Sequence, residues 1–177
     1  MRGYPADHTV RWMFFAKYLV AKPSYPIISL YPLHTYPGVF HRFPSGDDFG
    51  KWDRLDVGKT ITAFTTENPE AYPGRLILLV NEHTQSASEY ITMLLQSIPG
   101  TITIGSQTAG ADGDVVEIIM PLWLDLNYSS IGSYYPDGTN ALRAGGKIDR
   151  QVYPTVEGIR TGRDEVLEAA LYSINGQ

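Results

Sequence analysis

Cysteine is absent from the 177 residues, which excludes a thiol nucleophile, a thiolate metal site and a disulfide framework. An excess of positive charge is also missing. The 14 Lys and Arg residues against 19 Asp and Glu residues give a net charge of −5, so the basic footprint of a nucleic-acid-binding protein is lacking. The longest apolar runs, "LILLV" and "IIMPLWL", are far too short to span a bilayer. The sequence therefore predicts neither a nucleic-acid partner nor a membrane span.

Patterns for metals and cofactors are missing as well. No pair of histidines has the H-x-x-x-H spacing of a zinc site. The segment "GADGD" at 110–114 lacks the ligand spacing of a calcium loop, and it is typical of a tight turn before a strand. The segment "RAGGKID" at 143–149 lacks the spacing of a phosphate-binding loop. We therefore expect no metal and no cofactor.

The composition is that of a globular protein, with 43% hydrophobic and 19% charged residues. The length suits a single domain, and we assign residues 1–177 to one. Around a central βαβ unit, the pattern predicts the following elements: a helix over 5–20, a short strand ending near Pro32, a strand near 60–64, strands within 115–135, a hairpin turn at 136–140, and a closing helix over 162–174 with the apolar stripe Val166, Leu167, Ala170, Leu171 and Ile174.

The βαβ unit is the clearest prediction. "RLILLVN" at 75–81 is a continuous apolar run, which is typical of a strand buried on both faces of a parallel sheet. A helix from about Ser86 to Ser97 follows and is stopped by the pair Pro99-Gly100. "TITIGSQ" at 101–107 is the next strand, so the fold class is α/β with a mainly parallel sheet.

The helix opens with "SASE", and two interpretations of Ser86 remain open at this point. In the first, Ser86 and Glu89 form a capping box worth about 1 kcal/mol. In the second, Ser86 is a nucleophile, because it follows a buried strand through the short connection "EHTQ", and ligands and catalysis sit at such strand ends in open α/β sheets. The free N–H of Ala87 at the helix N-terminus would then stabilise an oxyanion.

Three segments together resemble a known family. "LILLVNEHTQSASEYITMLLQSIPGTITIGSQTAG" is similar to the nucleophile region of the C-terminal processing (tail-specific) serine peptidases and their tricorn-core relatives. "MRGYP" resembles the end of that family's "DLRG-x-P" strand, and "GGKIDRQVYPTVEGIRTGRDEVLEAAL" resembles its closing segment. The resemblance spans nearly the whole chain in order, and its serine segment is the specific part. It implies a Clp protease/crotonase-like fold of stacked β-β-α units, acyl transfer on a peptide or unfolded-protein substrate, and an extracytoplasmic location.

The resemblance also implies roles for individual residues. Ser86 corresponds to the nucleophile, and the backbone N–H groups of Ala87 and of the Gly3–Tyr4 segment correspond to oxyanion donors. The supporting positions that we assign around the serine are Glu89, Thr108, Gly110 and Asp112, of which Asp112 could orient a base.

The general base departs from the family pattern. The processing peptidases place a lysine directly after G-x-x-T-x-G, but here "GSQTAG" at 105–110 is followed by Ala111. The tricorn-like branch instead uses a histidine from further upstream, and this chain is closer to that branch. Within the chain, His83, three residues before Ser86, and His8, near the start of the first predicted helix, are the candidate bases.

Two functional hypotheses follow. In the first, the chain is the C-terminal part of a longer serine peptidase, its partner is the missing N-terminal half of the same protein, and it has little or no activity alone, because nucleophile and base work as a unit. In the second, it is a non-catalytic module that binds a peptide or a hydrophobic ligand, as retinoid-binding relatives on the same domain do. The missing lysine and the Tyr-, Phe- and Trp-rich segment 25–52 favour the second.

Overall fold

The computed structural model describes residues 2–3, 18–19, 28–32, 60–61, 68–113, 115–120, 122, 124–129 and 131–176. The predicted helix over 5–20 lies outside the described residues except for Tyr18 and Leu19. The same is true of the aromatic segment 25–52, apart from the strand within it.

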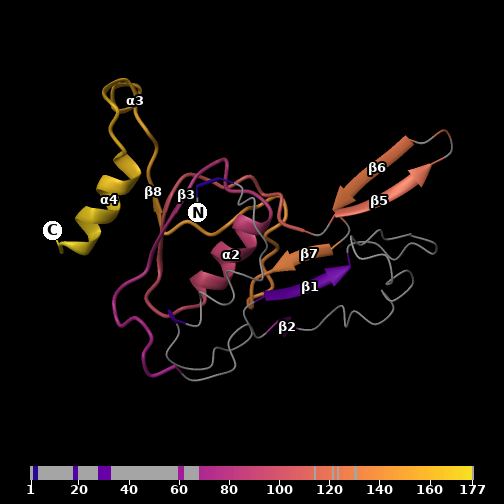
Figure 1. The fold of residues 1–177 in the computed structure, drawn as a ribbon, viewed down its shortest axis with the longest axis horizontal. Helices are drawn as coiled ribbons and strands as arrows, with labels where there is room; N and C mark the ends of the chain where they lie inside the picture. The colour runs from indigo at the N-terminus through magenta and orange to yellow at the C-terminus, as the bar shows by residue number, and fades with distance from the viewer. Residues whose placement is uncertain are drawn as a thin grey trace.

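A parallel βαβ unit forms the centre of the described structure, as predicted (Figure 1). Strand β3 (Ile77–Val80) leads through a short loop to helix α2 (Ala87–Gln96), which returns the chain to β4 (Ile102–Gly105). The two strands pair in parallel, with Val80 opposite Gly105, and β8 (Arg150–Gln151) extends the sheet in the order β3-β4-β8. Because the strands are parallel, the loops that follow β3 and β4 leave the sheet at the same edge.

Helices cover both faces of this sheet, because the side chains of a strand alternate between its two faces. Leu78 of β3 packs in one buried cluster with Ile91 and Leu94 of α2. Its neighbours Ile77 and Leu79 pack in a second cluster with Val166 and Ala170 of α4 (Glu165–Ile174). The α/β fold class with a parallel sheet is therefore confirmed, and its layers run α2, sheet, α4.

The remaining strands are antiparallel. Strand β1 (Ile28–Pro32) lies between β2 (Thr60–Ile61) and β7 (Ile131–Tyr134), and β5 (Val115–Met120) pairs with β6 (Leu124–Ser129) in a hairpin that extends away from the α2 region (Figure 1). After β7 the chain turns at the predicted segment 136–140. The Gly138 N–H closes this turn by donating to the Tyr135 carbonyl oxygen at 2.8 Å.

The C-terminal segment contains two helices where the sequence predicted one. Helix α3 (Val156–Thr161) begins at the Thr155 side chain, which accepts from the Gly158 N–H, and it ends at Gly162, whose φ of 71° is left-handed. Helix α4 begins at Glu165, three residues after Gly162, and is capped by the Asp164 side chain, which accepts from the Leu167 N–H. Neither helix, nor any other in the described part of the chain, is long and apolar enough to cross a membrane.

The predicted apolar stripe of the closing helix is partly wrong. Val166 and Ala170 are buried against the sheet, at 3% and 4% exposure. Leu167, Leu171 and Ile174 are exposed at 41%, 50% and 53%. Among the described residues the sheet has three strands, and of the predicted stripe only Val166 and Ala170 are buried against it.

Candidate active site at the carboxyl edge of the parallel sheet

The connection from β3 to α2 is a tightly bonded loop that ends in a strained serine. The Asn81 N–H donates to Thr84 Oγ1 at 3.0 Å, and the Thr84 N–H donates back to the Asn81 carbonyl oxygen at 2.9 Å. Ser86 follows with φ 51° and ψ −117°, a conformation that few residues other than glycine adopt. Such a backbone costs about 1–3 kcal/mol and persists only where its surroundings enforce it. A strained serine at a strand-to-helix turn is also how α/β-hydrolases expose their nucleophile.

Glu89 helps to hold the Ser86 backbone in this conformation through its side chain. Its side chain is fully buried, and its carboxylate accepts four hydrogen bonds. The donors are the Ser86 N–H at 3.1 Å, the Thr108 hydroxyl at 2.5 Å, the Gly110 N–H at 2.7 Å and the Ala111 N–H at 2.8 Å. One carboxylate therefore joins the serine turn to the loop that follows β4. Of the predicted supporting residues, Thr108 and Gly110 both bind the carboxylate of a third, Glu89.

The two halves of the predicted capping box differ. The Glu89 side chain does accept from the backbone N–H of Ser86. The Ser86 side chain lies at the Glu89 backbone N–H but makes no side-chain cap hydrogen bond there, and that N–H donates to the Ser86 carbonyl oxygen at 2.7 Å. Both members of the capping box are thus in place, as predicted, and the side-chain hydrogen bond that holds the helix start is the one that Glu89 accepts.

Position 111 lies beside the serine turn. The N–H groups of Ser86 and Ala111 both donate to Oε2 of Glu89. Two donors on one oxygen atom lie within a few ångströms of each other, so the side chain at 111 starts close to Ser86. The structure therefore places a methyl group where the resemblance expects a lysine.

Two glycines allow the loop that follows β4 to lie close to β3 and to the backbone at Arg143. A Cβ on Gly105, whose φ is 143°, would lie 1.9 Å from the Val80 carbonyl oxygen. A Cβ on Gly110, whose φ is 69°, would lie 2.9 Å from the Arg143 backbone. Any other residue at either position would push the loop away from β3 or from the Arg143 segment.

The N-terminal residues are held at the same edge. The Ser88 hydroxyl donates to the Gly3 carbonyl oxygen at 2.5 Å, and Ser88 is almost fully buried. The Arg2 guanidinium makes two hydrogen bonds, of 2.8 and 2.6 Å, to the Asp164 carboxylate at the start of α4. Gly3 is therefore held by Ser88, which follows Ser86 by two residues in the sequence. Tyr4, the second predicted backbone donor, lies outside the described residues.

The Ala87 N–H is the remaining predicted oxyanion donor. Ala87 is the first residue of α2, so its N–H has no partner within the helix. None of the described residues accepts a hydrogen bond from it. The helix dipole adds positive potential at this point.

Of the candidate bases, only His83 lies in the described structure. Its side chain is 76% exposed, and its Nε2 lies 3.6 Å from the Glu82 carboxylate. No hydrogen bond joins it to Ser86 within the described part of the chain. His8 lies outside the described residues, so both assignments stay predictions.

Asp112 follows Ala111 and is 5% exposed. Burial raises the pKa of its carboxyl group to about 7, with a smaller contribution from the negative charge of Glu89. Hydrogen bonds from the Ser133 hydroxyl and the Gly113 N–H oppose this rise in pKa. Its Oδ2 atom has no hydrogen-bond partner among the described residues.

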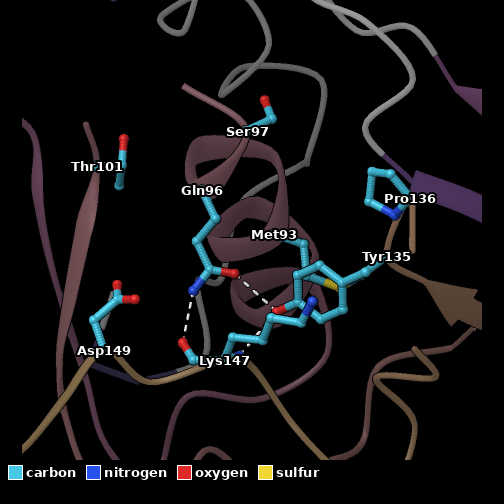
Figure 2. A pocket seen from close by; sticks show the side chains of 8 residues that line it. All are labelled: Met93, Gln96, Ser97, Thr101, Tyr135, Pro136, Lys147 and Asp149. Carbon is cyan, nitrogen blue, oxygen red and sulfur yellow. Dashed lines mark hydrogen bonds between the residues drawn. The ribbon is translucent and has the colours of Figure 1, made fainter. Parts of the chain in front are cut away.

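A hollow of about 270 Å³ lies at the other end of α2 (Figure 2). It is lined by Met93, Gln96, Ser97, Thr101, Tyr135, Pro136, Lys147 and Asp149. Its central polar groups bind one another: the Tyr135 hydroxyl donates to Gln96 Oε1 at 2.8 Å, and Gln96 Nε2 donates to the Lys147 carbonyl oxygen at 2.7 Å (Figure 2). Met93, the first lining residue on α2, is six residues after Ala87, so the hollow begins about 9 Å along the helix from the serine turn. Among the described residues there is also no cluster of His, Asp or Glu that could hold a metal ion.

Comparison with known structures agrees with this arrangement. A structure from Parabacteroides merdae, given as a candidate peptidase, superposes with a TM-score of 0.76 at 17% identity, covering 98% of this chain and 50% of that one. A candidate S41 protease from Bacteroides fragilis gives 0.61 at 15% identity, covering 96% and 42%. The photosystem II D1 C-terminal processing protease gives 0.56 at 17% identity, covering 88% and 34%.

At these identities the structural matches show a shared fold, which is the Clp protease-like α/β fold. The chain spans half or less of the length of each of the three structures. No curated protein matches it in sequence. The sequence model of peptidase family S41 matches residues 44–154, which is more than half of the chain. With a serine held at the start of α2 and a family match that contains it, this chain belongs to peptidase family S41 and forms a serine peptidase-like domain.

Proposed function

We propose that Ser86 is the nucleophile of an S41 peptidase site that cleaves peptide bonds by acyl transfer. The observation that carries this proposal is the backbone of Ser86, with φ 51° and ψ −117°, which is kept in place by the buried Glu89 carboxylate. In the reaction, Ser86 Oγ bonds to the substrate carbonyl carbon and its proton passes to a base. The Ala87 N–H and the Gly3–Tyr4 backbone donate to the resulting oxyanion, as positioned donors do in acyl transfer.

The base is the incomplete part of the site. Ala111 supports a tricorn-like arrangement, in which a histidine supplied from elsewhere takes the proton in place of a lysine. His8, His83 and a residue of the N-terminal half of a longer protein are the candidates. We propose that residues 1–177 are the C-terminal part of such a protein, and that the chain alone has little or no peptidase activity.

Two observations support a missing N-terminal partner. Strand β3 is at the end of the parallel sheet in the described residues. The anchored residues Arg2 and Gly3 lie at the carboxyl edge of that sheet, where a further strand leading into them would end.

A non-catalytic binding module is the second candidate function. The observation that favours it is the methyl group of Ala111 beside the serine turn, because a domain that has lost its base loses most of its catalysis. Its ligand would be a peptide or a hydrophobic molecule.

Labelling with a fluorophosphonate probe separates the two candidates. We expect slow labelling of the wild-type chain at Ser86, located by peptide mass spectrometry, and none in Ser86→Ala. The matched control is Ser97→Ala, at the far end of α2, which should label as the wild type does. Labelling that persists in Ser86→Ala would contradict the nucleophile assignment. Labelling of no variant, including Ala111→Lys, which supplies a base beside Ser86, would support the binding module.

A further inference from the structure

Asp112 occupies a distinctive place next to the serine turn. It directly follows Ala111, whose N–H shares Oε2 of Glu89 with the N–H of Ser86. Its carboxyl group also lies near Glu89 and Tyr90 of α2: the negative charge of Glu89 adds to burial in raising the pKa of Asp112, and the charge of Asp112 adds to burial in raising the pKa of Tyr90. The side chain therefore lies within the site but takes no part in the Glu89 network.

The unpartnered oxygen of Asp112 requires an explanation. A buried carboxyl oxygen without a donor costs free energy, and native proteins keep few such atoms. The neighbouring donors are already used: the Thr108 hydroxyl and the Gly110 and Ala111 N–H groups bind Glu89. The Tyr135 hydroxyl donates to Gln96. The Ser133 hydroxyl and the Gly113 N–H do donate to the Asp112 carboxyl group, but its Oδ2 atom still has no donor.

We propose that Oδ2 of Asp112 accepts a hydrogen bond from the nitrogen base of Ser86, an imidazole or an amine, so that Asp112 is the positioning carboxylate of the site. This inference rests on the proposed function of Ser86. A buried carboxylate that holds a base by one N–H, fixes its orientation and stabilises its cation is a recurring device in serine hydrolases. Asp112 has the burial, the supporting hydrogen bonds and the single free oxygen atom that this role needs.

The proton and electron changes are simple. As Ser86 Oγ bonds to the carbonyl carbon, the C=O π electrons move to oxygen and the hydroxyl proton moves to the nitrogen base. The base becomes a cation, and the Asp112 carboxylate faces it without taking the proton. A cation at this distance also lowers the pKa of a neighbouring carboxyl group, so the raised pKa of Asp112 belongs to the site without its base.

Imidazole is the probe for this inference. The pKa of Asp112 is measured by carboxyl-carbon NMR on the wild-type chain, with increasing imidazole at constant ionic strength. We expect imidazole to lower that pKa by at least about one pH unit, the effect of a nearby opposite charge. Asp137, an exposed carboxylate paired with Lys147, is the internal control and should not respond. An Asp112 pKa that imidazole leaves unchanged would overturn the inference.

A second measurement follows the rate of fluorophosphonate labelling at Ser86. In this reaction Oγ bonds to phosphorus, fluoride leaves, and the proton passes to imidazole. Imidazole should accelerate labelling at least about 100-fold, the lower range for general-base catalysis, in the wild type and in Asp137→Asn. It should not accelerate labelling in Asp112→Asn. Equal acceleration in Asp112→Asn would refute the role of Asp112 and leave Ser86 as the nucleophile. A lowered pKa without any labelling would retain the Asp112 site and refute the proposed function.

Discussion

The substitution Asp112→Asn tests how the buried carboxyl group affects stability. Asparagine keeps the shape of the side chain and an acceptor for the Ser133 hydroxyl, but it has no proton to lose. In the wild-type protein, folding raises the pKa of Asp112 from 3.8 to about 7. The folded state therefore binds this proton more tightly than the unfolded state does, and the group contributes stability that is fully present below about pH 4.

That contribution is lost as the pH rises through the folded-state pKa. Between pH 3.8 and about 7, the native chain holds more protons than the unfolded chain, so the free energy of unfolding falls with rising pH. Each pH unit corresponds to about 1.4 kcal/mol, and the interval of about three units gives about 4 kcal/mol in total. The free energy of unfolding of Asp112→Asn, relative to the wild type, should therefore rise by about 4 kcal/mol across this range.

Urea denaturation of both proteins at a series of pH values, followed by tryptophan fluorescence, gives the comparison. The matched control is Asp137→Asn. Hydrogen bonds from Lys147 and Thr139 lower the pKa of Asp137, so its contribution has the opposite sign: it is present at neutral pH and lost as the pH falls. If Asp112→Asn and the wild type show parallel pH dependence, the burial argument for Asp112 is wrong.

Three further predictions concern the contacts around the serine turn. Glu89→Ala leaves three N–H groups and a hydroxyl without their acceptor, so the free energy of unfolding should fall by at least about 3 kcal/mol in urea denaturation. A loss below about 1 kcal/mol would contradict the role of Glu89 in joining the serine turn to the loop after β4. Ser88→Ala removes the hydrogen bond to the Gly3 carbonyl oxygen and should lower the free energy of unfolding by about 1 kcal/mol, whereas an unchanged free energy of unfolding would contradict the anchor. Arg2→Ala breaks a half-exposed ion pair with Asp164, so it should cost less than about 1 kcal/mol, and a cost that high salt leaves unchanged would argue against an ionic origin.

The sequence predicted the βαβ unit well because its signals are local. The apolar run at 75–81 and the stop at Pro99-Gly100 each depend on a few neighbouring residues, and the structure has β3, α2 and β4 within those bounds. The apolar stripe of α4 was less informative. A pattern along a helix shows which residues are apolar, but the width of the sheet beneath decides which are buried.

The organisation of the site could be anticipated only in part. "SASE" pointed to Ser86 and Glu89 through their helix-capping signature, yet the main partners of Glu89 lie 19 to 22 residues away in the chain. No local pattern reports such contacts, and none reports the backbone strain of Ser86. The single free oxygen of Asp112 likewise depends on β7, which contributes Ser133, and on the loop around Gly113.

The most direct test of the central claim is the fluorophosphonate labelling rate of Ala111→Lys. The structure places residue 111 beside Ser86, so a lysine there would supply the missing base. The account predicts that Ala111→Lys labels at Ser86 at least about 100-fold faster than the wild type, the lower range for general-base catalysis, and that Ala111→Lys combined with Ser86→Ala does not label at all. A folded Ala111→Lys variant that labels no faster than the wild type, or at another residue, would contradict the assignment of Ser86 as the nucleophile.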